Sequence, residues 1–241
     1  ENRKRIRHVV RKHANEKVGF IKEDQIRPFI FLKERSPTTH QSHLAQFKSF
    51  FNFCLDRGWA MHSPAAKIKK PKTELKSIEY YKLPEVEEIM SVVKGYRDGV
   101  LVPYFSLLFF CGVRPEEVHC GLYGRKANKD NKPLSWDSIH LDSGSPMLVI
   151  EKTKGRSMRR IELEPNLVHI LKLSRSRGHD VFPAKNGRRF IEAIRDAISV
   201  NWIKDGARHT CLSALYARDN EMSLDKISRI AGNSPLVLQR H

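Results

Sequence analysis

The sequence lacks any apolar run near the roughly 20 residues that a membrane-spanning helix needs. Its first residues are charged, without the apolar segment of a secretory signal. Cysteine is scarce, and the cysteines lack the paired spacing of a metal site; they are Cys54, Cys111, Cys120 and Cys211. Because each has apolar neighbours, we expect reduced core residues. We therefore expect no membrane partner, no metal and no other cofactor.

Acidic residues are too few to balance the basic ones. The chain has 44 Lys and Arg against 27 Asp and Glu, a net charge of +17. Residues 1–76 hold 18 of the basic residues and 7 of the acidic ones, so this third has the larger excess. Each phosphate that a protein neutralises releases counterions, so the excess favours a nucleic acid. A basic but non-specific surface, as on ribosomal proteins, is the alternative.

The first part of the chain predicts a helical domain followed by a linker. Ser36 and the proline after it are typical of a helix start, and apolar residues recur at helical spacing until Gly58. Residues 67–78 are rich in lysine and poor in apolar residues, which is typical of an interdomain segment. We therefore divide the chain into domains at 1–76 and 77–241.

The second part predicts a mainly helical domain with a small β-sheet, an α+β arrangement. A helix begins near Leu83, and the nearly continuous apolar stretch 100–111 predicts a buried helix. A polar stretch from Gly121 to Pro133 predicts an exposed loop. Three short strands are predicted at 136–141, 147–150 and 160–163, and further helices at 165–175, 188–200, 208–217 and 224–231.

Two arginines attract attention because of what a pair of guanidinium groups can do. Arg114 follows the buried helix, and Arg208 begins a later one. Taken singly, each is most simply a structural ion pair or an exposed charge. If they converge, two planar and permanently charged groups can hold both non-bridging oxygens of one phosphodiester.

Four motifs in this order resemble the catalytic set of the tyrosine recombinases, the phage-integrase family. They are Cys111-Gly-Val-Arg-Pro-Glu-Glu-Val118, Lys152-Thr-Lys-Gly-Arg156, Asp205-Gly-Ala-Arg-His-Thr210 and the segment from Ile230 to His241. Ser36 to Lys72 is similar to the last helices of that family's core-binding domain. The resemblance covers most of Ser36–His241 and implies a helical core-binding domain and a catalytic domain that together clamp DNA.

The resemblance also implies roles for individual residues. Arg114 and Arg208 would clamp the phosphate, and Lys154 would protonate the leaving 5′ oxygen, with Lys152 as the other possible register. Glu117 and His209 would support the site. Lys67, Lys69, Lys70 and Lys72 of the linker would suit DNA phosphates if the two domains clasp a duplex, although a plain solvated linker would look much the same, and Arg156 is a further DNA-binding candidate.

Two positions depart from the family pattern. Asp205 stands where the family has a histidine three residues before Arg208, and it could accept a proton or cap the following helix. Asn233 replaces a second histidine; it can donate a hydrogen bond to phosphate but cannot titrate. We include both in the catalytic set.

The nucleophilic tyrosine of the family would fall directly after His241. We therefore expect a catalytic domain cut just before its nucleophile, since none of the six tyrosines stands in this register. Tyr216, on the helix that follows Arg208, is interpreted as a packing residue.

The resemblance implies a site-specific DNA recombinase or integrase of a mobile genetic element. It would act through a 3′-phosphotyrosyl intermediate, as a homo-tetramer on double-stranded DNA when intact. Its place would be the cytoplasm, at the nucleoid of a prokaryote or a phage-infected cell. The alternative is a non-catalytic DNA-binding protein on the same fold, which Asp205 and Asn233 favour. An RNA-binding protein is a weaker third hypothesis, because no RNP-type aromatic strand motif is present.

Overall fold

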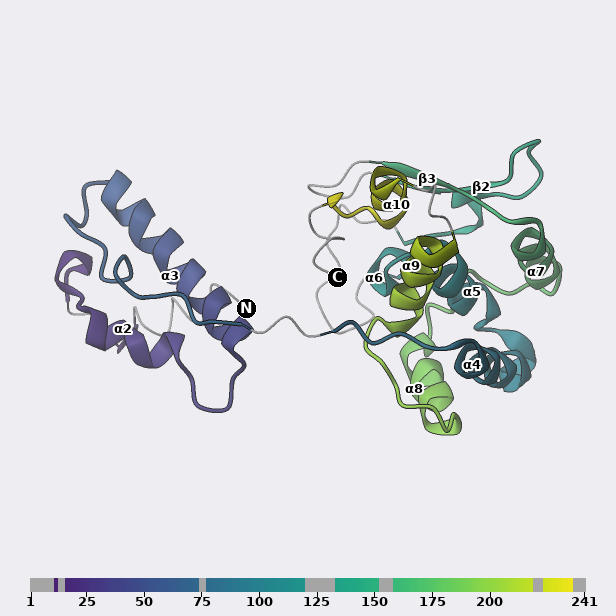
Figure 1. The fold of residues 1–241 in the computed structure, drawn as a ribbon, viewed down its shortest axis with the longest axis horizontal. Coiled ribbons are helices and arrows are strands. Elements are labelled where there is room, and N and C mark those ends of the chain that lie inside the picture. The colour runs from purple at the N-terminus through teal and green to yellow at the C-terminus, as the bar shows by residue number, and fades with distance from the viewer. Residues whose placement is uncertain are drawn as a thin grey trace. The chain divides into compact units, whose positions relative to one another are not determined.

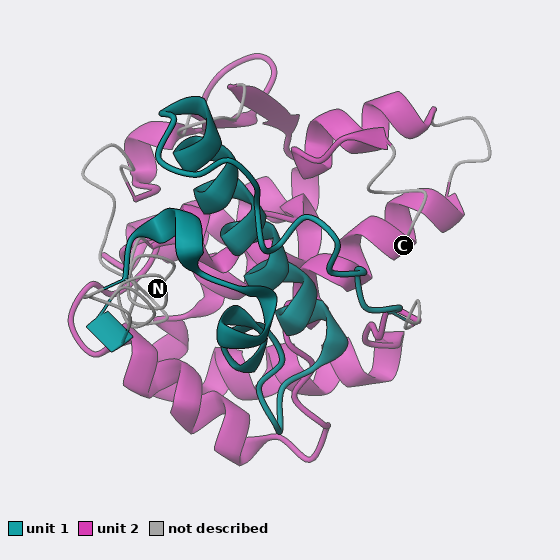
Figure 2. Cartoon of the chain, turned by 90° about the vertical axis from the view of Figure 1, so that its left-hand side faces the viewer, with its two compact units in different colours: residues 1–76 teal, residues 77–241 magenta. Residues whose placement is uncertain are grey.

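A computed structural model describes residues 11–12, 16–73, 77–119, 133–151, 158–218 and 223–235. The chain divides into two compact units, Glu1–Lys76 and Ser77–His241, coloured separately in Figure 2. The elements of each unit are labelled in Figure 1.

The first unit is built on two helices, α2 (Glu23–Ile30) and α3 (Pro37–Asp56), preceded by the 3-10 turn η1 (Val18–Phe20). The predicted start of α3 is confirmed, because Ser36 Oγ accepts a hydrogen bond from the backbone N–H of Thr39 at 3.3 Å. Gly58 follows the helix with φ 68°, the left-handed conformation that glycine adopts without strain. The helices bury a shared core that includes Ile26, Ile30, Phe47 and Phe51.

The lysine-rich segment after α3 is partly fixed to this core. Ile68 is only 2% exposed and packs with the first unit, so the predicted linker is more ordered at its start than its composition indicates. Farther on, Gln41 of α3 donates a hydrogen bond to the carbonyl of Pro71 at 2.5 Å. Apolar contact and side-chain hydrogen bonding thus hold the start of the segment that its lysine-rich composition predicts to be a free linker.

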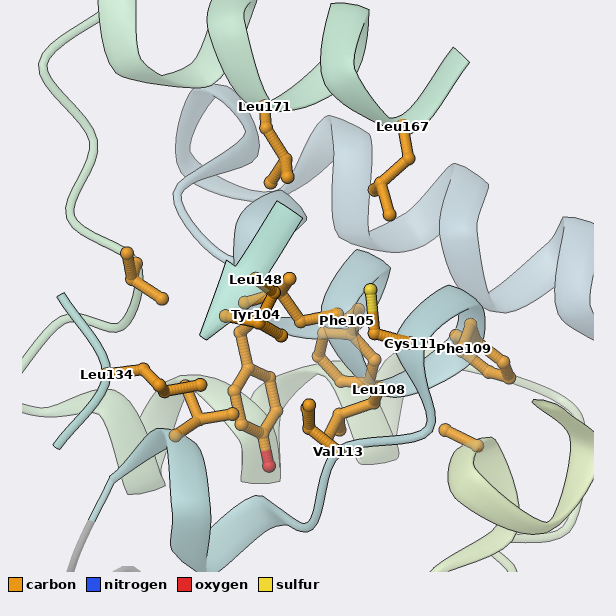
Figure 3. Packing of buried hydrophobic residues seen from close by; sticks show 14 of the residues in the cluster. Tyr104, Phe105, Leu108, Phe109, Cys111, Val113, Leu134, Leu148, Leu167 and Leu171 are labelled. Carbon is orange, nitrogen blue, oxygen red and sulfur yellow. The ribbon is translucent and has the colours of Figure 1, made fainter. Parts of the chain in front are cut away.

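The second unit is built around α5 (Val102–Cys111), the predicted buried helix, of whose ten residues eight are buried. It packs against α4 (Leu83–Gly95), α7 (Pro165–Ser176) and α9 (Gly206–Arg218). Figure 3 shows its aromatic residues beside Leu148 of the sheet and the leucines of α7. The unit also contains η2 (Tyr96–Gly99), α6 (Pro115–Val118), α8 (Gly187–Ala197) and α10 (Leu224–Ala231).

The sheet has three antiparallel strands in the order β1-β2-β3: Ile139–His140, Met147–Ile150 and Arg159–Glu162. The prediction of a strand over 136–141 was wrong for its first half, since Trp136–Ser138 forms the 3-10 turn η3. In this turn the indole N–H of Trp136 donates a hydrogen bond to the carbonyl of His179 at 2.8 Å. Among the described residues, the predicted class of a mainly helical protein with a small sheet is confirmed.

The structure tests some of the other expectations and leaves others outside the described residues. The helix predicted at 188–200 ends at Ala197, because the N–H of Ser199 turns aside to the Glu88 carboxylate at 2.6 Å. Cys54, Cys111 and Cys211 are buried free thiols, whereas Cys120 lies outside the described residues. The loop predicted from Gly121 to Pro133 also lies almost entirely outside them. No helix in the described ranges is both long and apolar enough to span a bilayer.

Candidate active site

Arg114 owes its position to a sharp turn at the end of α5. Gly112 ends that helix with φ 58°, and a Cβ there would lie 3.2 Å from the sulfur of Cys211 on α9, so the turn sits tightly on α9. Arg114 then precedes α6, and the Glu117 side chain accepts the backbone N–H of Arg114 at 2.8 Å. This capping interaction places the side chains of Arg114 and Glu117 together, with Arg114 Nη1 3.1 Å from Glu117 Oε1.

Arg208 lies in the first turn of α9 and is only 5% exposed. Its guanidinium donates to two backbone carbonyls, that of Gly112 and that of Ala231, the latter at 2.5 Å. It therefore joins the turn that carries Arg114 to the end of α10. Burial, followed by repulsion from Arg114, lowers the pKa of Arg208 to about 9, so the group remains a cation at neutral pH.

Asn233 follows the end of α10 and is brought to Arg114. Gly232 caps the helix with φ 59°, and the N–H of Asn233 returns to the carbonyl of Ser228 at 3.1 Å. Arg114 Nη2 donates to the carbonyl of Gly232 at 3.3 Å and to the side-chain oxygen of Asn233. A helix C-terminus has partial negative charge, so this end of α10 is a favourable place for guanidinium groups.

A third arginine, Arg159, completes the cluster, and the sequence analysis missed it. It is the first residue of β3, is 7% exposed, and donates to Glu117 Oε2 at 2.6 Å and to the carbonyl of Ala231 at 3.1 Å. The sequence could have indicated this residue, because alternate residues of a strand face the same side of the sheet. Arg159 alternates with Ile161 and Leu163, which are buried. An arginine on the core face of a strand must find an acceptor there.

The carboxylate of Glu117 accepts hydrogen bonds from Arg114 and Arg159 and attracts Arg208 through its charge. Its burial by itself would raise its pKa, but the attraction of Arg159, then Arg114 and Arg208, outweighs burial and leaves the pKa lowered. The cluster therefore holds three positive charges against one negative charge. Such an excess in a poorly hydrated place attracts an anion.

Two further predicted residues lie nearby but make other contacts. Asp205 is exposed, with φ 57°, just before α9, and its carboxylate makes no hydrogen bond within the described part of the chain. Its carbonyl accepts the N–H of His209 at 3.0 Å. The ring of His209 contacts the carbonyl of Glu79 at 3.2 Å and so fixes α9 to the segment that leads into α4.

The structure does not place the remaining predicted residues relative to the cluster. Lys152, Lys154 and Arg156 lie outside the described residues, as does the segment after Pro235. The lysines predicted to bind DNA are exposed in the first unit; they are Lys67, Lys69, Lys70 and Lys72. The interpretation of Tyr216 as a packing residue was wrong, because it is 66% exposed. In the described ranges, no group of His, Cys, Asp or Glu is arranged to hold a metal ion.

Comparison with known proteins identifies the fold. No protein-family model matches the sequence, and no curated protein matches it. Solved structures do match. One is the Tn1549 transposon integrase in complex with transposon right end DNA, with a TM-score of 0.68 and 13% identity over 100% of this chain and 89% of that one.

Two other recombinases are similar. A lambda integrase tetramer bound to a Holliday junction matches with a TM-score of 0.69 and 13% identity, over 97% of this chain and 67% of that one. The site-specific recombinase XerH, bound to its palindromic difH substrate, matches with a TM-score of 0.63 and 14% identity, over 96% and 70%. These neighbours are tyrosine recombinases, and the present chain has their fold.

Proposed function

We propose that this chain is a site-specific DNA recombinase or integrase that cuts and rejoins DNA through a 3′-phosphotyrosyl intermediate. One observation carries the proposal: Arg114 and Arg208, which are distant in sequence, reach the same end of α10, where Asn233 lies. The neighbours in fold include an integrase bound to transposon DNA and one bound to a Holliday junction, which supports DNA as the substrate.

In the proposed reaction, the phenolic oxygen of a tyrosine attacks phosphorus as the bond to the 5′ oxygen breaks. Arg114 and Arg208 hold the non-bridging oxygens and stabilise the charge that develops on them. Asn233 adds a neutral donor. The leaving 5′ oxygen takes a proton from Lys154, or from Lys152 in the other register, and Asp205 is the candidate acceptor for the tyrosine proton. Attack by a 5′ hydroxyl reverses the step and conserves the bond energy.

The same proposal covers binding and assembly. The exposed lysines of residues 67–72, together with Arg156, would contact phosphates, so binding should weaken steeply with salt. Lambda integrase is found as a dimer and as a tetramer on DNA, which supports assembly of four protomers on two duplexes.

The test begins with a duplex selected from a random pool for binding to this chain. A parent chain with a tyrosine after His241 is then mixed with a nicked form of that duplex, which traps the covalent adduct. Arg208→Ala should reduce adduct formation about 100- to 1000-fold and leave binding within about tenfold of the original. Arg218→Ala, on the same helix with a side chain 68% exposed, is the matched control and should retain the adduct. An adduct that survives Arg208→Ala would refute the assigned site.

Asp205 and Asn233 favour a second candidate, a non-catalytic DNA-binding protein on the same fold. Neither residue is the histidine of the family pattern, and Asn233 cannot exchange a proton. This candidate predicts tight, salt-dependent binding to the selected duplex with no adduct, even when a tyrosine follows His241.

A further inference from the structure

Arg159 shares an acceptor with each of the two proposed phosphate-binding arginines. It shares the Glu117 carboxylate with Arg114, at 2.6 Å for Arg159 and 3.1 Å for Arg114. It shares the carbonyl of Ala231 with Arg208, at 3.1 Å and 2.5 Å. On the core face of β3 it is 7% exposed, about as buried as Arg208, whereas the Arg114 side chain is 21% exposed.

The position of Arg159 limits how Glu117 can bind Arg114. Oxygen Oε2 of Glu117 accepts from Arg159 Nη2 and from the backbone N–H of Arg114, so the Arg114 side chain bonds the other oxygen, Oε1. Nη2 of Arg114 is left to reach Gly232 and Asn233. Without Arg159, the strongest geometry for Glu117 would be a two-pronged pair with the Arg114 guanidinium. That pair would draw Nη2 away from the end of α10.

The end of α10 is shaped to receive Arg159. A Cβ on Gly232 would lie within 2.0 Å of Arg159 Nη1, so the guanidinium fills the space that any other residue would need. Independently of this contact, the left-handed φ of Gly232 is a backbone conformation that glycine adopts without strain. Arg159 therefore fixes the segment that carries Asn233 as well as the carboxylate beside Arg114.

We propose that Arg159 is a positioning residue that occupies Glu117 and the end of α10 so that Arg114 faces the DNA phosphate. The inference rests on the proposed function, since it assigns Arg159 to the same phosphate site. Arg159 itself need not touch the DNA. Its effect is to keep the Arg114 guanidinium from closing onto Glu117.

The test measures how strongly one phosphate is held. In the selected duplex, single phosphates are replaced in turn by uncharged methylphosphonates, and the resulting loss of DNA affinity is measured for each position. The site phosphate is the one whose replacement weakens binding by the original chain but not by Arg114→Ala. For the original chain this loss should be about tenfold or more. If no phosphate behaves in this way, the proposed phosphate site fails, whatever Arg159 does.

Arg159→Met should then reduce the loss at the site phosphate to about twofold or less, because Arg114 has turned to Glu117. Arg159→Met combined with Glu117→Gln should recover part of it, since the competing carboxylate is gone. Arg160→Met is the matched control, the next residue of β3 on its exposed face, and should keep the full loss. Thermal melting of each variant reports separately on stability.

A folded Arg159→Met protein that keeps the full loss would overturn the inference and make Arg159 a structural residue alone. If Arg159→Met does not fold, Arg159→Lys decides. A lysine keeps the charge but not the planar guanidinium that bonds Glu117 and Ala231 together. The loss of affinity on replacing the site phosphate should therefore lie between about tenfold, as in the original chain, and about twofold, as expected of Arg159→Met. An unchanged loss in Arg159→Lys would equally overturn the inference.

Discussion

The guanidinium of Arg114 donates a hydrogen bond to the side-chain oxygen of Asn233, which lies 119 residues later in the chain. The same nitrogen also reaches the carbonyl of Gly232 at 3.3 Å. An amide in this position can accept from the arginine through oxygen while its nitrogen remains able to donate to a phosphate. The pair therefore links the turn after α5 to the end of α10 without using a titratable group at position 233.

Asn233→Asp should weaken binding to the site phosphate by about tenfold or more. A carboxylate next to Arg114 would form a charged pair and repel the phosphate, while the fold stays intact. Affinity for the selected duplex, with and without the methylphosphonate, measures the change. Equal affinity of the two proteins for the unmodified duplex would contradict the proposed role of Asn233.

Asn233→His should give strand cleavage a new dependence on pH. Imidazole titrates near pH 6.5, whereas the amide of Asn233 does not titrate. We expect the rate ratio of variant to original to change across about pH 5.5 to 7.5. Adduct formation is measured in a parent chain with a tyrosine after His241. A ratio that stays flat over this range would count against contact between residue 233 and the reacting phosphate.

Glu117→Gln should destabilise the second unit by about 3 kcal/mol at neutral pH, because Arg114 and Arg159 would lose the charged partner that they share. The pKa of Glu117 is lowered in the folded state from an ordinary value of 4.5. Its contribution is therefore complete above about pH 4.5 and is lost as the pH falls through the folded value. Urea unfolding of both proteins over this range checks the sign. A stability difference that grows on acidification would contradict it.

Gly232→Ala should cost more stability than Gly178→Ala. Both glycines have positive φ, 59° and 76°, so each alanine carries a left-handed penalty of about 1 kcal/mol. At Gly178 an added Cβ meets nothing within 4 Å, whereas at Gly232 it meets Arg159. The excess cost of Gly232→Ala, measured by thermal melting, should shrink when Arg159→Met is also present. An equal cost at the two glycines would show that Arg159 can move aside freely.

Asp205→Gly should remove the proposed proton acceptor without straining the local backbone. Asp205 has φ 57°, which glycine adopts more easily than aspartate, so stability should be kept or slightly raised. If the carboxylate accepts the tyrosine proton, adduct formation should fall about 100-fold while DNA affinity is unchanged. An unchanged adduct rate would remove Asp205 from the catalytic set.

Much of the fold follows from local patterns. Ser36 and Gly58 mark the two ends of α3 through a side-chain cap and a left-handed residue, both of which are visible in the sequence. The apolar stretch of α5 and the bounds of α10 were predicted in the same way. These features depend on neighbours within one or two turns, so the sequence carries the information directly.

What only the tertiary structure decided are the contacts that depend on distant backbone. The acceptors of Arg208 and Arg159 at the end of α10 include the carbonyl of Ala231, and a backbone carbonyl has no signature in the sequence. The turn at Trp136 likewise depends on the carbonyl of His179. The sequence by itself therefore determined most of the helices and the cap of α3, and its resemblance to a family singled out Arg114, Arg208 and Asn233 as candidates. Their convergence, and the contacts of Arg159 with Glu117 and Ala231, required the packing of α5, α9, α10 and β3, because hydrogen bonds to backbone are chosen by position rather than by residue type.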